Sequence, residues 1–324
     1  MTNASALPTP LRGIIPPMVT PLADRDTLNV PGLERLVEHI LGGSPAGLFI
    51  LGTNGEGPSL SYRLRHELID RVAEQVAGRV PVLVGITDTA FAESVEVADY
   101  AADAGAQAVV LAAPPYYPTG QRDLAEYVEH IVAELPLPVF LYNMPSHTKL
   151  AFDVETVRRL MDVPNIVGLK DSSGDMIYFH RVRELTARRP DFSLLIGPEE
   201  LLAQAVLSGA HGGVSGGANL EPRLYVDLYH AAASRDLDRV AELHARVMQI
   251  SGSIYTVDQS GSGVLKGLKC ALSCMGISND LPAEPLQPFP DAERELIRRR
   301  LGELGLLIDR PTATPASASL PRRG

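Results

Sequence analysis

Lys170 is the side chain of this sequence best placed for covalent chemistry. The chain has four lysines, at positions 149, 170, 266 and 269, against twenty-five arginines. Lys170 ends the apolar run 166–169. At the carboxyl end of a buried strand, desolvation favours the neutral amine, which can attack a carbonyl carbon. We therefore predict a Schiff-base lysine, and an ordinary ion pair between Lys170 and Asp171 is the alternative.

Hydroxyl groups follow three other apolar runs. Tyr142 ends the run that precedes Lys170, and Thr53 and Tyr117 follow two earlier runs. A phenol can carry the protons that carbinolamine formation and dehydration require, provided that another hydroxyl relays them. We predict that Tyr142 is this acid–base group and that Thr53 and Tyr117 are relay candidates. The alternative is that Tyr142 only caps the core, with its hydroxyl in water.

A glycine-rich loop occupies residues 52–57, with the sequence Gly-Thr-Asn-Gly-Glu-Gly. Glycines allow consecutive backbone N–H groups to converge, and the Thr53 hydroxyl adds a donor, so this loop is a candidate cradle for a carboxylate. It lacks the trailing Gly-Lys-Ser/Thr of a P-loop, which disfavours a nucleoside triphosphate. By itself, such a loop is also compatible with a simple tight turn.

Two other chemistries are weaker candidates. Ser215 lies in a Gly-x-Ser-x-Gly pattern at 213–217, with His230 and His244 downstream. A nucleophile elbow needs an acid placed between serine and histidine, but the acids before His230 fall in a predicted helix, so a serine hydrolase is disfavoured. The eight histidines include neither His-x-His nor His-Glu-x-x-His, so the sequence predicts no metal site.

The elements that must position these groups alternate between strand and helix. β-branched apolar runs predict eight strands, over 14–19, 47–51, 80–85, 108–112, 138–142, 166–170, 193–196 and 213–215. Helical spacing between them predicts helices over 33–41, 63–76, 92–104, 124–135, 153–161 and 176–188. Eight such units predict a (β/α)8 barrel, because an open sheet usually has fewer strands and opens with a dinucleotide fingerprint, which is absent here. The loops after the strands then meet at one mouth.

After Asn219 the strand pattern stops. Helices are predicted over 221–234, 237–251, 264–274 and 291–304. We therefore predict three parts: a barrel over 11–233, a C-terminal helical annex over 234–308, and a flexible tail over 309–324 that is rich in Pro, Ala and Ser.

Composition narrows the class of protein. The chain is 45% hydrophobic and 21% charged, which excludes overall disorder. Its net charge of −10 and the lack of a long basic block disfavour nucleic acid and anionic membranes as partners. The N-terminus does not resemble a signal peptide and no apolar run approaches about 20 residues, so we predict a cytoplasmic protein. Cys270 and Cys274 fit a buried helical face better than a metal or redox pair.

Together these segments resemble the dihydrodipicolinate synthase and N-acetylneuraminate lyase superfamily of pyruvate-type class I aldolases. The likeness extends over about residues 11–307. It rests on four segments that occur in the family's order and spacing, at 52–56, 115–117, 142–145 and 168–171. The resemblance implies a lyase with the barrel fold derived above.

The resemblance also implies roles for single residues. Lys170 would form the Schiff base, Tyr142 and Thr53 would relay protons, and Tyr117 would reach in from an adjacent subunit of a tetramer built from dimers. No cofactor is implied. We expect the 2-oxo acid substrate to contact Gly52, Thr53, Asn54, Gly197, Val214 and Ser215.

Some positions depart from the synthases proper. Those enzymes look like Tyr-Asn-x-Pro-Ser-Arg, and here His147 occupies the place of the arginine, so a pH-dependent group replaces a permanent bidentate cation. The segment 170–175 is similar to family members that act on 2-keto-3-deoxy sugar acids or 4-hydroxy-2-oxoglutarate. Glu199 and Glu200 fall where sialic acid lyases carry an acidic pair for sugar hydroxyls, although both could simply begin the next helix.

We therefore expect a Schiff-base aldolase or lyase for a 2-oxo acid, which releases pyruvate or dehydrates its substrate. The alternative within the family is the 4-hydroxy-tetrahydrodipicolinate (dihydrodipicolinate) synthase of lysine biosynthesis. A more distant alternative is a barrel that binds a keto acid without turnover. Such a protein would keep the carboxylate cradle but should have lost Lys170 or Tyr142, and both are present.

Overall fold

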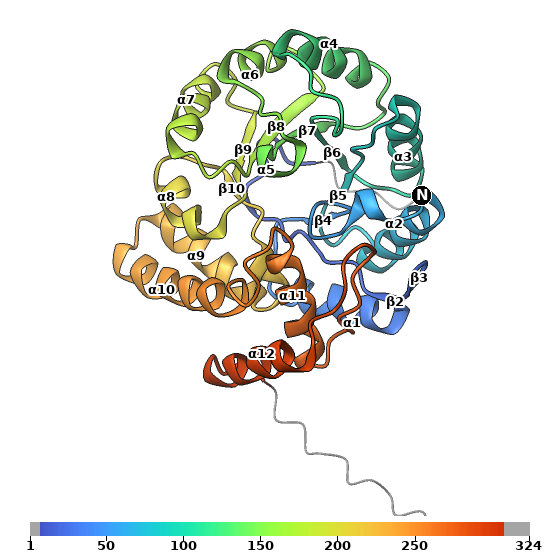
Figure 1. Ribbon diagram of the computed structural model, residues 1–324. Helices are drawn as coiled ribbons and strands as arrows, with labels where there is room; N and C mark the ends of the chain where they lie inside the picture. Colours follow the sequence, from blue (N-terminus) through green and yellow to red (C-terminus); the bar gives the residue numbers. More distant parts are fainter. Residues whose placement is uncertain (1–6, 308–324) are drawn as a thin grey trace, which may run out of the picture.

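The centre of the molecule is a ring of parallel strands, seen end-on in Figure 1; the computed structural model describes residues 7–307. Hydrogen bonds join the strands in the order β1-β10-β9-β8-β7-β6-β5-β4, and the ring closes where Pro17 bridges Phe49 in parallel. This arrangement confirms the predicted (β/α)8 barrel. The strands are β1 (Gly13–Ile14), β4 (Leu48–Ile50), β5 (Val82–Gly85), β6 (Ala108–Ala112), β7 (Val139–Asn143), β8 (Ile166–Asp171), β9 (Ser193–Ile196) and β10 (Gly212–Gly213).

The first strand is shorter than predicted. Regular pairing stops after Ile14 because Pro16 and Pro17 follow, and proline has no N–H to donate to a ladder. The chain nevertheless continues along β4, since the Met18 N–H donates to the Phe49 carbonyl at 2.8 Å. The chain over 14–19 therefore runs along the barrel as predicted, but only part of it has the hydrogen bonds of a regular strand.

Helices surround the ring on its outer face (Figure 1). Where the sequence offers Asn, Ser or Asp before a helix, that side chain accepts a backbone N–H of the first turn, as Asn29, Ser61, Asp153 and Asp175 do. The outer helices are α1 (Val30–Leu41), α2 (Tyr62–Val76), α3 (Phe91–Asp103), α4 (Gln121–Val132), α6 (Val154–Leu160), α7 (Met176–Thr186), α8 (Leu202–Leu207) and α9 (Pro222–Ser234).

Several short elements were not predicted, because they are too short to produce a periodic pattern. An antiparallel hairpin separates β1 from α1, and short helical turns follow β4, β7, β9 and β10 at the barrel mouth. These elements are β2 (Leu22–Asp24), β3 (Thr27–Leu28), η1 (Gly57–Ser59), α5 (Pro145–Thr148), η2 (Glu199–Leu201) and η3 (Gly216–Asn219).

Three helices follow the barrel: α10 (Leu237–Ile254), α11 (Gly263–Cys274) and α12 (Asp291–Glu303). Helix α10 packs on α9, α11 packs on η3, and α12 packs on α10 and α11, so the annex covers one side of the barrel (Figure 1). Cys270 and Cys274 lie on α11, as free thiols. The predicted tail over 309–324 lies outside the described residues. Within 7–307, no helix combines the length and apolar character needed to cross a membrane.

Alternation along the strands decides which side chains face the barrel interior. On β7, Phe140 and Tyr142 belong to the cluster inside the ring, whereas Leu141 belongs to the layer between strands and helices. On β8, Leu169 also belongs to the outer layer. Lys170 therefore points inward, because successive side chains of a strand lie on opposite faces.

Candidate active site

Lys170 and Tyr142 are neighbours across two strands at the barrel mouth. They are paired in the register of β7 and β8. Nζ of Lys170 lies 3.8 Å from the centroid of the Tyr142 ring and 5.1 Å from that of Phe49. Lys170 is only 5% exposed. An amine placed over aromatic faces and shielded from water is held in one position by cation–π attraction.

The alternative ion pair between Lys170 and Asp171 does not form. Asp171 points to the other face of β8, where its carboxylate accepts hydrogen bonds from Nδ2 of Asn143 at 2.9 Å and from the Ser173 hydroxyl at 3.0 Å. Oδ1 of Asn143 in turn accepts the Phe152 N–H at 3.1 Å. Burial raises the pKa of the Asp171 carboxyl, and the bonds from Asn143 and Ser173 oppose that rise. Asp171 thus fixes the ends of β7 and β8, and Lys170 remains free on the inner face.

A glycine makes room for the floor beneath Lys170. Gly168 shares the inner face of β8 with Lys170, and a β-carbon at this position would come within 2.5 Å of the Phe140 ring. Phe140 fills that space, and together with Phe49 it forms an apolar floor below the amine. The two aromatic rings were not among the predicted site residues. Their inward position follows from strand alternation, which is the signal that could have identified them.

The Tyr142 hydroxyl is in contact with Thr53, as the relay hypothesis requires. The two oxygens are 3.1 Å apart, and either can be the donor. Burial by itself raises the pKa of the Tyr142 phenol, but the charge of Lys170 and hydrogen bonds to Thr53, Lys170 and Ser172 outweigh burial, so its pKa lies below the ordinary value. A phenol with a lowered pKa releases its proton more readily than an ordinary tyrosine, so Tyr142 is suited to act as a proton donor.

Tyr117 does not join this group within one chain. Its side chain is 76% exposed, and its ring packs edge-on against that of Tyr116, which is 84% exposed. The backbone of Tyr116 is left-handed, with φ of 86°. The segment after β6 therefore presents two adjacent tyrosines on the outside of the protomer.

The loop after β4 is tightly folded, and at several of its positions only glycine has room. Leu51 is left-handed with φ of 57°, and a β-carbon on Gly57 would come within 2.2 Å of its carbonyl oxygen. Gly52 lies against the Phe49 ring. Thr53 and Asn54, between these glycines, are only partly buried. The loop thus presents both side chains at the mouth, next to Tyr142.

The loop after β10 lies beside this loop, because only β1 separates β10 from β4 in the ring. Val214 belongs to the cluster inside the barrel, and Ser215 is fully buried. Among the described residues, Oγ of Ser215 has no hydrogen-bond partner, imidazole nitrogens included. The nucleophile–base pair that a serine hydrolase needs is therefore not present in this part of the chain. Asn54 reaches the neighbouring Gly216, where a β-carbon would lie 3.0 Å from Nδ2 of the asparagine.

His147 lies on the short helix α5, which crosses over the barrel mouth in Figure 1. Its side chain is exposed, and Nδ1 is 3.0 Å from Oγ of Ser146. The protein atoms that shield one part of the ring from water, together with the charges of Lys149 and Lys170, lower the pKa of His147. At neutral pH this imidazole is therefore uncharged, and it cannot replace a guanidinium as the partner of a carboxylate.

The carboxylate of Glu199 binds groups of the protein itself, whereas the sequence suggested that it binds substrate hydroxyls. It is 3% exposed, and its carboxylate accepts hydrogen bonds from the Gly217 N–H at 2.7 Å, the Tyr225 hydroxyl at 2.7 Å and the Tyr255 hydroxyl at 2.8 Å. These donors come from η3, α9 and the C-terminal end of α10, so Glu199 ties the mouth to the helices behind it. Glu200 is partly buried in the turn η2.

Gly197 directly follows β9, beside the end of β8. Its N–H donates to the Asp171 carbonyl at 2.7 Å, and a β-carbon here would overlap the Ser172 hydroxyl. Gly197 therefore allows the ends of β8 and β9 to approach closely. The hydroxyl of Ser172 also lies near Tyr142 and contributes to its lowered pKa.

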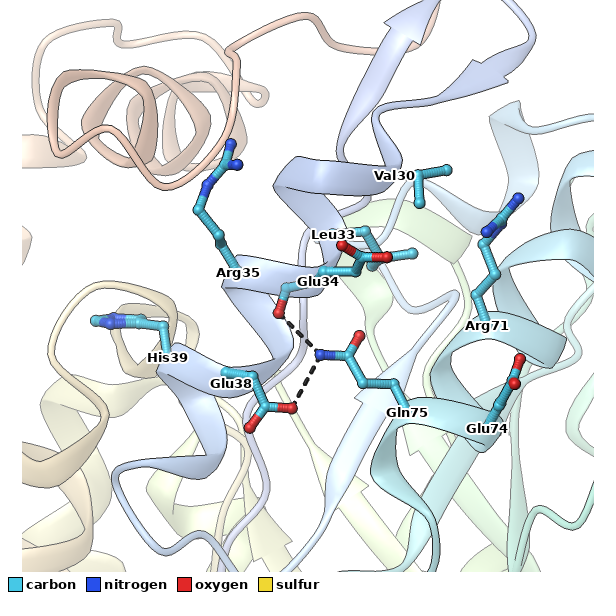
Figure 2. A pocket seen from close by; sticks show the side chains of 9 residues that line it. All are labelled: Val30, Leu33, Glu34, Arg35, Glu38, His39, Arg71, Glu74 and Gln75. Atoms are coloured by element: carbon cyan, nitrogen blue, oxygen red, sulfur yellow. Dashed lines mark hydrogen bonds between the residues drawn. The ribbon is translucent and has the colours of Figure 1, made fainter.

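A groove on the outer face of the barrel is separate from this site. Figure 2 shows its lining, which comes from α1 and α2. Within the groove, Gln75 donates to Glu38 at 2.9 Å and to the Glu34 carbonyl at 2.9 Å. Arg79, outside the groove, also pairs with Glu38. None of the predicted site residues lines this groove.

Comparison with known proteins extends over the barrel and the annex together. The sequence model of the dihydrodipicolinate synthetase family matches residues 10–304. A 4-hydroxy-tetrahydrodipicolinate synthase of Methanopyrus kandleri is 33% identical over 92% of this chain and 97% of its own length. A protein of Halobacterium salinarum named as an uncharacterized DapA-like lyase is 30% identical over 93% of this chain and 96% of its own length.

Solved structures agree with these matches. A dihydrodipicolinate synthase from Bacteroides thetaiotaomicron is 54% identical, covers 91% of this chain and 99% of its own, and superposes with a TM-score of 0.88. YagE of Escherichia coli, a prophage protein of the same family in complex with pyruvate, is 28% identical over 91% of this chain and 99% of its own, with a TM-score of 0.86. The relatives thus share the whole architecture, and their names include both synthases and lyases.

Proposed function

The chain belongs to the dihydrodipicolinate synthetase family, whose members are class I lyases that form a Schiff base with pyruvate, and we propose that Lys170 forms this bond here. The observation that carries the proposal is the position of Nζ: it is buried and lies over the Tyr142 ring, and the Tyr142 hydroxyl contacts Thr53. A nucleophile, a proton carrier and a relay hydroxyl are therefore contiguous.

The proposed first stage condenses Lys170 with the keto group of a 2-oxo acid. The loop 52–57 holds the substrate carboxylate through Thr53 and Asn54, and Ser215 offers a buried hydroxyl to the same end. Nζ attacks the carbonyl carbon, and a proton moves from nitrogen to oxygen through Tyr142 to give a carbinolamine. Tyr142 then protonates the hydroxyl, water leaves, and an iminium remains on Lys170.

The second stage breaks a bond of the substrate. In an aldol cleavage, the electrons of the C3–C4 bond move into the iminium, a base removes the C4 hydroxyl proton, and an aldehyde leaves. Protonation of the enamine at C3 and hydrolysis by water then release pyruvate and free Lys170. In a dehydration, the same electron sink allows loss of the C3 proton and of a hydroxyl group instead. Because the iminium formed on Lys170 is the electron sink in both cases, no cofactor is required.

We propose that Tyr117 completes the proton relay from a second copy of the chain. In one protomer Tyr117 is exposed and lies outside the group around Lys170. Its exposure beside Tyr116 fits a side chain that enters the mouth of a neighbouring subunit. The proposal therefore includes a dimer or a tetramer of dimers as the active assembly.

For the substrate, we propose a 2-keto-3-deoxy sugar acid or 4-hydroxy-2-oxoglutarate. His147 supports the sugar acid in particular, because its lowered pKa disfavours the charged imidazole that would bind the carboxylate of a second substrate or the distal carboxylate of 4-hydroxy-2-oxoglutarate. Glu199 adds no support for a polyol tail, since three protein donors occupy its carboxylate. Glu200 is the remaining acidic candidate.

The second candidate is 4-hydroxy-tetrahydrodipicolinate synthase. It is favoured by the names of several relatives, including the 54% identical protein of Bacteroides thetaiotaomicron. The two candidates share Lys170 and Tyr142 and differ in whether pyruvate couples with an added aldehyde. A barrel that binds a keto acid without turnover is less well supported, because the nucleophile and its proton carrier are in contact.

The test is borohydride reduction in the presence of a panel of 2-oxo acids, followed by peptide mass spectrometry. We expect one reduced pyruvyl adduct on Lys170, which Lys170→Ala removes. An adduct on Lys149, Lys266 or Lys269 instead would overturn the assignment. In parallel, a fluorophosphonate should leave Ser215 unlabelled. Turnover of the same panel then separates sugar-acid cleavage from dehydration and from coupling with aspartate semialdehyde.

A further inference from the structure

Glu56 closes the loop that carries Thr53 and Asn54. Its backbone is left-handed, with φ of 56°, and its N–H donates to the Thr53 carbonyl at 3.1 Å. A left-handed conformation is costly for a residue with a side chain and persists where the surroundings impose it. The loop therefore needs an external support at Glu56, and a second one is found at Gly55, whose carbonyl accepts the buried Thr20 hydroxyl at 2.7 Å.

The support at Glu56 comes from the C-terminal annex. The Glu56 carboxylate is buried and contacts the annex. One oxygen accepts the Ala283 N–H at 2.6 Å, and the other forms an ion pair with Nζ of Lys269 on α11. Lys269 is 1% exposed and also donates to the Leu281 carbonyl at 2.8 Å. Glu56 is the only acid of the 52–57 loop. The groups that bind its carboxylate, Lys269 and Ala283, lie more than 200 residues later in the chain.

A buried ion pair of this kind is held only when both partners are well fixed. Burial lowers the pKa of Lys269, and the charge of Glu56 opposes that effect. Removal of one partner leaves the other charge buried without compensation, which is far more disruptive than removal of both. If Lys269 is lost, the Glu56 carboxylate is expected to move toward water, and the strained loop moves with it.

We propose that Lys269 is a positioning residue for the substrate carboxylate. Through Glu56 it sets the geometry of the 52–57 loop and therefore the affinity of Thr53 and Asn54 for that carboxylate. This inference rests on the proposed function in that the loop is taken to be the carboxylate site. It assigns the annex a part in substrate binding, beyond its packing on the barrel.

The test compares Lys269→Met with the double variant E56Q/K269M and with Leu301→Ala. Leu301 is a buried side chain of α12, which packs on α10 and α11, so its truncation disturbs the annex without touching the ion pair. The glutamine of the double variant keeps an acceptor for the Ala283 N–H while both charges are gone. This variant also covers the case in which Lys269→Met alone does not fold.

The first measurement is the rate of borohydride trapping against pyruvate concentration. For Lys269→Met we expect the half-saturating concentration to rise at least tenfold, and the maximal rate to fall by a smaller factor, because Lys170 and Tyr142 lie on strands outside the loop. The double variant should return to within about threefold of the wild type. Leu301→Ala should melt earlier and keep the wild-type half-saturating concentration.

The second measurement, hydrogen exchange of the 52–57 amides, needs no substrate. Exchange should be at least tenfold faster in Lys269→Met than in Leu301→Ala. An unchanged half-saturating concentration and unchanged loop exchange in Lys269→Met would overturn the inference, as would equal effects in Leu301→Ala. If the wild-type protein traps no pyruvate at all, the proposed function fails, and the exchange measurement still decides whether Lys269 holds the loop.

Discussion

Nζ of Lys170 lies over the face of the Tyr142 ring, 3.8 Å from its centroid, while the hydroxyl of the same ring is 3.1 Å from Oγ1 of Thr53. The face of the Tyr142 ring thus contacts the amine, and its hydroxyl group is available for proton transfer. A phenylalanine would keep the first function and lose the second. This separation makes the two roles of Tyr142 testable by one substitution.

We expect Tyr142→Phe to keep the fold and to lose roughly 10²- to 10⁴-fold in turnover, the scale of a positioned acid–base group. The aromatic face remains, so Lys170 should stay in place. Its iminium with pyruvate should still form, only slowly, and should still be trapped by borohydride. Steady-state turnover, circular dichroism and mass spectrometry measure the three properties. Wild-type turnover in this variant would show that Tyr142 is a core cap.

Gly168→Ala should damage the floor of the site. The added carbon would meet the Phe140 ring at 2.5 Å, so the ring must move and Lys170 above it with it. Overpacking of this kind costs about 1–3 kcal/mol in the free energy of unfolding, and trapping of pyruvate should slow. Gly252→Ala on α10 is the matched control, since a β-carbon at that position would have no described atom within 4 Å apart from its chain neighbours and the backbone of its own helix. The control should unfold like the wild type or be more stable by as much as about 1 kcal/mol.

Glu199 should make stability depend on pH. Burial raises its pKa from 4.5 to about 7, and the bonds from Gly217, Tyr225 and Tyr255 only partly oppose this. Below pH 4.5 both the folded and the unfolded carboxyl are protonated. Between pH 4.5 and 7 only the unfolded carboxyl ionises, so this residue lowers stability as pH rises, by about 3 kcal/mol at 1.36 kcal/mol per pH unit. Above pH 7 the penalty is constant.

The corresponding experiment is urea unfolding of the wild type and Glu199→Gln at several pH values. The amide can keep the network, because its oxygen can accept from Gly217 while the hydroxyls of Tyr225 and Tyr255 rotate to accept from its nitrogen. The variant should lose less stability than the wild type between pH 4.5 and 7. Parallel curves for the two proteins would contradict the raised pKa.

His147 should limit reaction with aspartate semialdehyde. An uncharged imidazole cannot form the two parallel bonds that a guanidinium makes to a carboxylate. We expect slow or absent coupling of pyruvate with this aldehyde, and a gain in His147→Arg without a change in pyruvate trapping. Efficient coupling by the wild type, at about 10⁴ M⁻¹s⁻¹ or more, would make the synthase the better assignment.

Tyr117 can be tested by complementation between subunits. Tyr117→Phe and Lys170→Ala should each be nearly inactive alone. In a mixed dimer, one site receives both defects and the other receives neither, so mixing the two proteins under conditions of subunit exchange should restore activity. Random pairing gives roughly a quarter of the wild-type level for a two-fold assembly. No recovery after verified exchange would mean that Tyr117 does not act across the interface.

Some features of this protein are determined by its sequence alone. The strand that ends at Lys170 and the strand that ends at Tyr142 are recognisable as apolar runs, and parallel strands of a barrel bring their carboxyl ends to one mouth. Alternation along those strands fixes which side chains face inward. These properties depend on neighbours a few residues away, so a local pattern is enough to predict them. The barrel, its order of elements and the pairing of Lys170 with Tyr142 follow from it.

Other features were decided only by the tertiary structure. The sequence could not say whether Glu199 faces substrate or core, because its partners are Tyr225 and Tyr255, 26 and 56 residues away. It held no sign that Glu56 would meet Ala283 across 227 residues. The residues next to a loop carboxylate do not decide whether it binds water, substrate or a donor from a distant segment. Its partner is set by which remote segments the fold brings within hydrogen-bond distance, and a single pattern of apolar residues carries no such information.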